Sequence, residues 1–184
     1  NGEIINADSM QIYKEFSILS SRPTRQEEKK VVHHLYGFIS VKNNFSVGQW
    51  FNLAKKKIFK CHNNNKTPIL VGGTGLYFNT ITKGLSKIPN IDHQVRVKTR
   101  KLFNHLGAEN FYKRLLEVDP KVKDKLLPSD SQRSQRAYEV FMQTKKSLFD
   151  WIKNTKSDFR DYEIKKVFLN IPRDILLKKI SFRT

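Results

Sequence analysis

The chain has 184 residues, enough for one domain with a small insertion, and 38% of them are hydrophobic, which argues against general disorder. Its net charge of +18, from 35 basic and 17 acidic residues, indicates an anionic partner. Nucleic acid is the commonest such partner, ahead of a membrane surface or an anionic metabolite. The single cysteine, Cys61, excludes an intrachain disulfide.

No apolar run approaches the roughly 18 residues needed to span a membrane, and no signal peptide is visible. We therefore expect a cytoplasmic protein with no membrane partner. A monomer is the default expectation.

The first half of the chain combines short apolar runs with one clear helical pattern. Residues 3–7 predict a strand that ends at Asp8. Residues 68–71 predict a second strand, and its continuous apolar character indicates a buried position in a parallel sheet. Between them, Ser46 begins an amphipathic helix whose apolar residues recur at spacings of three and four, namely Val47, Trp50, Phe51, Ala54 and Ile58.

The second half is rich in lysine and arginine. Residues 88–127 predict a helical insertion, because they contain no strand candidate. Residues 166–171 predict a third strand. We therefore expect an α/β fold with a mostly parallel sheet, formed by residues 1–87 and 128–184 around the insertion.

Two segments have the composition of a functional site. Asp8 follows a strand, so it should emerge at the carboxyl edge of the sheet, where it can accept a proton or hold a cation. It can equally well cap the following helix. Residues 72–75 read Gly-Gly-Thr-Gly, which allows a ligand to approach the backbone closely but also suits a simple tight turn. No GK[ST] follows them, so this is not a Walker A loop.

Two further patterns are ambiguous or negative. Arg133 and Arg136 share a helix face, which suits phosphate groups or base edges, although a solvated helix with an Arg136–Glu139 pair explains them too. His33 and His34 should point to opposite faces of a strand, with no cysteine or acidic cluster beside them in the sequence. We therefore expect no metal site at these histidines.

Taken together, these segments resemble the tRNA dimethylallyltransferase (isopentenyltransferase) family. The match runs in the family's order through residues 1–14, 33–35, 45–47, 70–77, 84–85 and 130–140. The resemblance implies a P-loop-NTPase-like core with a helical insertion that contacts tRNA. It also implies transfer of a dimethylallyl group from dimethylallyl diphosphate to N6 of the adenine on the 3′ side of the anticodon, with Mg²⁺ as the metal ion.

The resemblance further implies roles for individual residues. Asp8 matches the proposed general base that acts on the adenine amine. Arg183 matches the arginine that steadies the diphosphate. The implied tRNA contacts are Asp8, Ser9, Met10, Gln11, Thr74, Arg96, Gln132, Arg133, Ser134, Gln135 and Arg136.

The chain also departs from the family pattern. The family's diphosphate-binding loop, of the form GxTxxGK[ST], and its carboxyl-terminal region are not in this sequence, so we expect a fragment that is inactive alone. Lys145 stands where the family usually has glycine. Two other readings stay open. One is a non-catalytic RNA-binding module, and the other is a small-molecule P-loop kinase, which would need neither the +18 charge nor the arginine pair.

Overall fold

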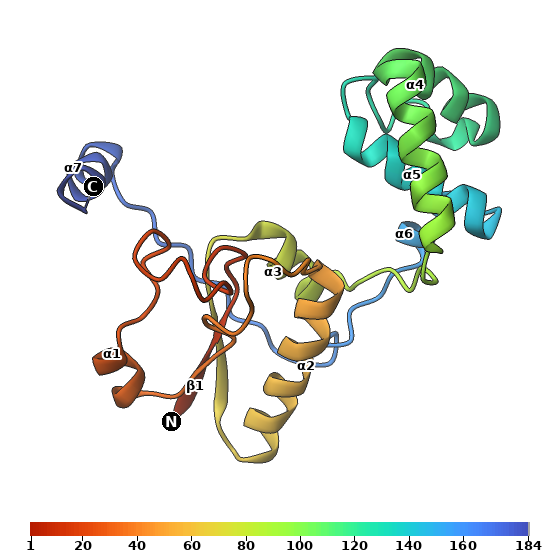
Figure 1. Ribbon diagram of the computed structural model, residues 1–184. Coiled ribbons are helices and arrows are strands. Elements are labelled where there is room, and N and C mark those ends of the chain that lie inside the picture. The colour runs from red at the N-terminus through yellow and green to blue at the C-terminus, as the bar shows by residue number, and fades with distance from the viewer. Residues whose placement is uncertain (184) are drawn as a thin grey trace.

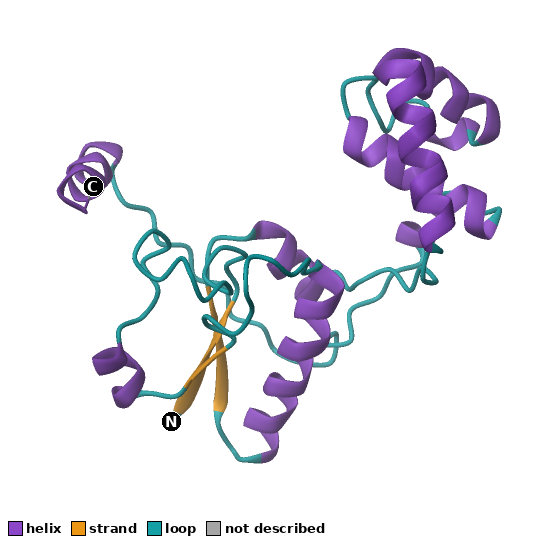
Figure 2. Cartoon of the chain, viewed as in Figure 1, coloured by secondary structure: helices purple, strands orange, loops and turns teal. Residues whose placement is uncertain are grey.

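The computed structural model of the protein describes residues 1–183, with the side chains of residues 1–182. The predicted diphosphate contact of Arg183 falls outside the described side chains. Strands β1 (Gly2–Asn6), β2 (His33–His34) and β3 (Thr67–Val71) form a parallel sheet in the order β2-β1-β3 (Figure 2). Ile4 pairs with His33 on one side of β1, and Ile5 pairs with Leu70 on the other. The predicted parallel α/β sheet is confirmed at these strands.

Two helices pack against the sheet and form the larger hydrophobic core. They are α2 (Val47–Asn63) and α3 (Gly75–Thr82). Helix α2 begins as predicted, because Ser46 and Gln49 form a reciprocal capping box. Trp50 on α2 stacks on Tyr77 of α3 with ring centroids 4.1 Å apart. The buried core residues are Ile5, Ala7, Trp50, Phe51, Ala54, Ile58, Tyr77, Ile81 and Phe159.

Strand β3 is less buried than its apolar sequence predicted. Ile69 is 46% exposed and Val71 is 45% exposed, whereas Leu70 packs against the core. Side chains alternate between the two faces of a strand, and α2 and α3 cover only the face that carries Leu70. The prediction of a fully buried strand was therefore wrong for the other face.

A separate helical unit lies beyond two linkers from the sheet (Figure 1). It contains α4 (His93–Val118), which is broken at Gly107 with a φ of 72°, the short 3₁₀ helix η1 (Pro120–Val122), α5 (Ser131–Thr144) and α6 (Leu148–Lys153). Its own buried core contains residues from α4, η1 and α5, including Phe111, Val122 and Ala137.

The packing of α5 bears on the domain boundary predicted at residue 127. Tyr138 of α5 lies 5.2 Å, centroid to centroid, from Phe111 of α4, so α5 belongs with the insertion rather than with the sheet. The sequence assigned α5 to the α/β core, because a helix does not reveal which apolar surface its buried face contacts. We propose a helical unit that extends from about residue 92 to residue 153.

The strand predicted at residues 166–171 does not form. This stretch has no regular secondary structure, and Val167, Phe168 and Leu169 are each more than 80% exposed. The apolar pattern suits a strand, but a strand also needs a neighbour, and among the described residues this segment pairs with neither edge strand of the sheet, β2 or β3. The remaining helices are α1 (Arg25–Lys30) and α7 (Arg173–Arg183).

Candidate active site

Asn6, the last residue of β1, holds the backbone that presents Asp8. Asn6 is fully buried, and its Nδ2 donates to the Asp8 carbonyl at 2.9 Å and to the Leu35 carbonyl at 3.0 Å. Its Oδ1 accepts from the Asp8 amide at 2.9 Å. The Trp50 indole nitrogen donates to the Asn6 carbonyl at 2.8 Å. These bonds fix the position at which Asp8 leaves the sheet.

The two oxygens of the half-buried Asp8 carboxylate have different surroundings. Oδ1 accepts from the amides of Met10 at 2.7 Å and Gln11 at 3.4 Å, so it caps the turn that follows β1. Among the residues that the structure describes, no donor bonds to Oδ2. A Cβ added at Gly73 would lie 3.5 Å from Oδ2. One oxygen therefore has the capping role and the other is available to a ligand.

The loop after β3 is joined closely to the loop after β1. A Cβ at Gly72 would lie 2.2 Å from the Ala7 carbonyl carbon, so only glycine fits at this approach. The Thr74 amide donates to the Ala7 carbonyl at 3.1 Å. The Thr74 hydroxyl accepts from the Ser9 amide at 2.8 Å and donates to Oγ of Ser9 at 3.2 Å. The structure thus brings Ser9 and Thr74 together beside Asp8.

Two tyrosines that the sequence analysis missed lie near the Asp8 carboxylate. Burial raises the pKa of Tyr36 to about 12, and the negative charge of Asp8 adds to the effect. Burial likewise raises the pKa of Tyr77 to about 12, with further contributions from Tyr13 and Asp8. Both phenols stay protonated at neutral pH. Their positions depend on the folded chain, and no local pattern in the sequence points to them.

The other two residues of the predicted Asp-Ser-Met-Gln segment differ in exposure and in role. Met10 is 51% exposed and open to a partner. The Gln11 side chain is already engaged, because its Nε2 donates to the carbonyls of Ser20 at 2.9 Å and Ser21 at 3.1 Å. Gln11 therefore fastens the loop that follows, and its predicted contact with tRNA stays a prediction.

Arg96 belongs to the helical unit but lies beside residues of the unit that contains the sheet. It is exposed in the first turn of α4 and shares a cavity of about 470 Å³ with residues from the loops after β1 and β2 and from the start of α2. The lining residues are Tyr13, Val41, Asn43, Asn44, Phe45, Ser46, Gln49 and Arg96. Arg96 thus lies at a boundary between the two units, beside the same cavity as Tyr13, which follows Asp8 in the chain.

The predicted tRNA-contacting residues of α5 lie in the helical unit, apart from the sheet edge (Figure 1). Gln132 and Arg133 are exposed, and Gln135 and Arg136 are partly buried. Arg136 lies 3.6 Å from Glu139, the pair that the alternative reading anticipated. Arg133 lies 3.9 Å from Asp130 and keeps 74% of its side chain exposed.

Ser134 has a different environment from the other α5 candidates. It is 1% exposed, and within the described chain its Oγ has no hydrogen-bond partner. The side chain faces the interior of the helical unit, where an RNA strand has no access. Ser134 therefore occupies a packing position on α5, and its predicted contact with tRNA stays a prediction.

Across the described residues, no helix has both the length and the apolar character needed to cross a bilayer.

The family model described as IPP transferase matches residues 11–184. A tRNA dimethylallyltransferase of Pelagibacter ubique is 50% identical over 183 residues, which cover 100% of this chain and 58% of that protein. A tRNA dimethylallyltransferase of Ehrlichia canis is 45% identical over 183 residues, which cover 100% of this chain and 60% of that protein.

Solved structures agree with the sequence matches. The full-length tRNA isopentenylpyrophosphate transferase of Bacillus halodurans matches with a TM-score of 0.57 at 29% identity, covering 100% of this chain and 56% of that one. A eukaryotic dimethylallyltransferase, described in snapshots of its action on tRNA, matches with a TM-score of 0.74 at 27% identity over 85% of this chain and 39% of that one.

These matches define the fold and the family. The chain spans about 58% of the length of the Pelagibacter relative and 60% of that of the Ehrlichia relative. Its parallel sheet and helices have the P-loop-NTPase-like fold of the solved neighbours, as the sequence predicted. The chain belongs to the IPP transferase family.

Proposed function

We propose that the full-length protein transfers a dimethylallyl group from dimethylallyl diphosphate to N6 of the adenine on the 3′ side of the anticodon in tRNA. The observation that carries this proposal is the position of Asp8. Its Oδ2 is open at the carboxyl edge of the sheet, and Gly73 and Thr74 of the neighbouring loop lie beside it. Ligands of open parallel sheets bind at this edge.

Asp8 has the chemistry that the transfer requires. An exocyclic adenine amine is a weak nucleophile, and it must lose a proton as its nitrogen bonds to the allylic carbon. The carbon–oxygen bond to the diphosphate breaks in the same reaction, and the diphosphate leaves with the electron pair. Oδ2 of Asp8 accepts the proton, while Oδ1 stays bonded to the Met10 amide, which holds the carboxylate in one orientation.

The basic surface accounts for the second substrate. A net charge of +18 attracts an RNA backbone, and Arg96 and Arg133 extend that charge onto α4 and α5. The adenine has to leave its stack to reach Oδ2, as in other enzymes that modify a base. A structural neighbour is described acting on tRNA, which supports the same substrate class here.

The residues near Asp8 fit a Mg²⁺ ion that takes most of its ligands from a diphosphate. Mg²⁺ prefers oxygen ligands and binds through one or two carboxylates together with phosphates and waters. This edge of the sheet offers neutral oxygen ligands in the Ser9 and Thr74 hydroxyls. When bound, the ion would neutralise charge on the leaving diphosphate.

The substitution Asp8→Asn in the full-length protein tests the base role. It keeps the shape of the side chain and removes the proton acceptor. We expect kcat for dimethylallyl transfer to fall by a factor of about 100 or more, while the Kd for tRNA changes less than about threefold. Asp150→Asn is the matched control, because it makes the same change on α6 of the helical unit, where Asp150 bonds to Lys121, so kcat should fall much less.

Equal losses of turnover and tRNA affinity in Asp8→Asn would contradict the base role. Wild-type protein that binds tRNA but transfers nothing would leave the RNA-binding module as the better reading.

A further inference from the structure

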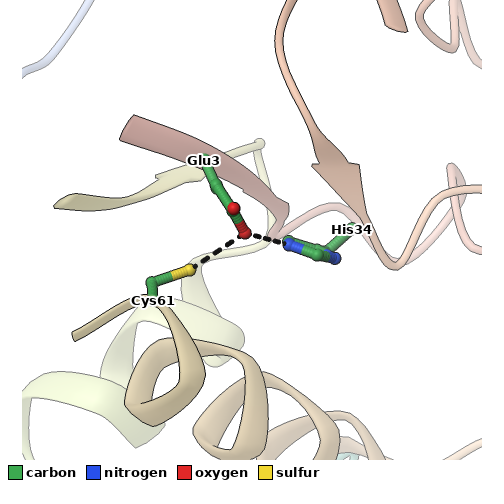
Figure 3. A group of neighbouring side chains, drawn as sticks. All are labelled: Glu3, His34 and Cys61. Carbon is green, nitrogen blue, oxygen red and sulfur yellow. Dashed lines mark hydrogen bonds and ion pairs between the residues drawn. The ribbon is translucent and has the colours of Figure 1, made fainter. Parts of the chain in front are cut away.

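A second cluster of reactive side chains lies away from the candidate active site. Glu3, His34 and Cys61 converge from β1, β2 and α2 (Figure 3). Glu3 is the second residue of β1, so the cluster lies toward the amino end of the sheet, whereas Asp8 follows its carboxyl end. Glu3 is 31 positions from His34 and 58 from Cys61, so no local pattern in the sequence connects them.

The three side chains meet at one carboxylate oxygen. Oε2 of Glu3 lies 2.6 Å from Nε2 of His34 and 3.4 Å from Sγ of Cys61 (Figure 3). The three potential ligand atoms all lie within 4.8 Å of one another. Lys66 bonds to the other oxygen, Oε1, at 2.6 Å and leaves Oε2 to the histidine and the thiol. The N–H of His34 and the S–H of Cys61 therefore both point to the space between the three atoms, which is where a cation would bind.

The composition and burial of the cluster select a class of cation. Cys61 is fully buried and Glu3 is 7% exposed, whereas the side chain of His34 is 13% exposed and that of Lys66 is 31% exposed. A thiolate, an imidazole and a carboxylate form a mixed ligand set that suits Zn²⁺. Mg²⁺ prefers oxygen ligands only, so this cluster is chemically unlike the edge at Asp8. The partly exposed side chains of His34 and Lys66 mark the side from which an ion can enter.

We propose that Glu3, His34 and Cys61 bind Zn²⁺ through Oε2, Nε2 and Sγ, with Lys66 retained on Oε1 as an outer partner. The ion displaces the thiol proton to solvent, and the neutral imidazole carries its proton on Nδ1 instead of Nε2. The carboxylate and thiolate together offset the two charges of the ion. Three protein ligands leave one position for water. The bound ion would tie β1, β2 and α2 together at the amino end of the sheet.

Cobalt titration of the 184-residue chain tests this site directly, and it does not depend on the proposed activity. Co²⁺ reports coordination through its visible bands, and a thiolate ligand adds a charge-transfer band in the near ultraviolet. Since Cys61 is the only cysteine in the chain, that band can come from no other residue. We expect the band to appear with one equivalent of Co²⁺, to disappear when Zn²⁺ is added, and to persist in excess Mg²⁺.

Variants separate the site from incidental binding. Cys61→Ser should abolish the charge-transfer band, and His34→Gln should weaken Co²⁺ binding more than about tenfold. His33→Gln is the matched control, because the neighbouring ring bonds through Nδ1 to the Val31 carbonyl at 2.8 Å and lies outside the cluster. It should leave the affinity unchanged.

Thermal unfolding provides a second readout. Zn²⁺ should raise the Tm of the wild-type chain and of His33→Gln but not that of Cys61→Ser, because a ligand stabilises only the state that binds it. The absence of a charge-transfer band in the folded wild-type chain would overturn the proposal. An unchanged affinity in His34→Gln, or an equal Tm shift in Cys61→Ser, would also overturn it.

Discussion

At Gly72, the absence of one methyl group allows two loops to touch. The Thr74 amide reaches the Ala7 carbonyl only because nothing larger than hydrogen lies between the backbones. The bond between the Ser9 amide and the Thr74 hydroxyl then joins the two loops beside Asp8. The geometry of the candidate base therefore depends on a residue that carries no functional group.

The substitution Gly72→Ala tests this dependence. Its Cβ would lie 2.2 Å from the Ala7 carbonyl carbon, so the loops must separate, and we expect a loss of about 1–3 kcal/mol in the free energy of unfolding. Gly75→Ala is the control, because a Cβ there meets nothing within 4 Å and alanine favours helix α3, which begins at this residue. Denaturant unfolding of both variants measures the difference. Similar stabilities would contradict the close approach.

At the level of single residues, the sequence predicted the functional side chains that follow a strand. It did not predict the side chains that hold them in position or surround them. Asp8 was singled out because it directly follows an apolar run, and the role of Thr74 was implied by the family resemblance. Asn6 and Tyr36 were missed, because the Asn6 bond to the Leu35 carbonyl and the burial of Tyr36 arise only in the folded chain. The burial of Ser134 was not predicted, since neighbouring positions of one helix can face either solvent or core.

Among the helices, α5 ends at a residue that suits its position poorly. Lys145 is the C-terminal cap of α5 and has a φ of 56°, in the left-handed region that favours glycine. This is the position at which the chain departs from the glycine usual in the family. The backbone of the neighbouring Lys146 is not in the left-handed region. The Nζ of Lys146 lies 4.4 Å from the Trp151 ring centroid.

We therefore expect Lys145→Gly to raise the free energy of unfolding by about 1 kcal/mol, because glycine adopts this conformation without strain. Lys146→Gly is the matched control and should lower stability, since it removes the contact with Trp151 and gains no relief of strain. Thermal unfolding of the two variants gives the comparison. A lower stability of Lys145→Gly would show that the cap is not strained.

The exposed face of α5 gives a test of RNA binding. Arg133→Ala in the full-length protein should weaken tRNA binding and reduce the slope of log K against log salt by about 0.7–0.9, the value for one lost phosphate contact. Arg114→Ala on α4 is the control, because its guanidinium is held by Glu117 at 2.6 Å and is also exposed. Equal effects of the two variants would indicate a general basic surface rather than a site on α5.

Elements specified by local sequence were predicted well, and elements specified by distant partners were not. Helix α2 carries its own capping box and apolar stripe, so its start and its buried face could be read directly. Residues 166–171 have a strand-like pattern, but pairing depends on an adjacent edge that no local pattern encodes. The packing of α5 against α4 is likewise a contact between segments far apart in the chain.

On the scale of the whole molecule, the chain combines two hydrophobic cores with one strongly basic charge. The sheet with α2 and α3 forms one core, and α4, η1 and α5 form the other (Figure 1). The cavity at Arg96 has lining residues from both units, so the two units meet there. Asp8 supplies the proposed chemistry, and the helical unit supplies exposed cations for the proposed RNA partner.

The chain spans 58% of the Pelagibacter relative, and no GK[ST] sequence occurs in it. We therefore expect the 184-residue chain alone to give no dimethylallyl transfer, even where it retains affinity for tRNA. Turnover by the 184-residue chain would show that the diphosphate is held without a loop of that kind.

The most direct test is transfer of the labelled dimethylallyl group from its diphosphate to total tRNA by the full-length protein, followed by nucleoside digestion. The 184-residue chain and full-length Asp8→Asn serve as comparisons. The account predicts label at N6 of the adenine 3′ to the anticodon with the wild-type full-length protein, and little or none with the other two. Bound tRNA that acquires no label from the wild-type protein, or label at another position, would contradict it.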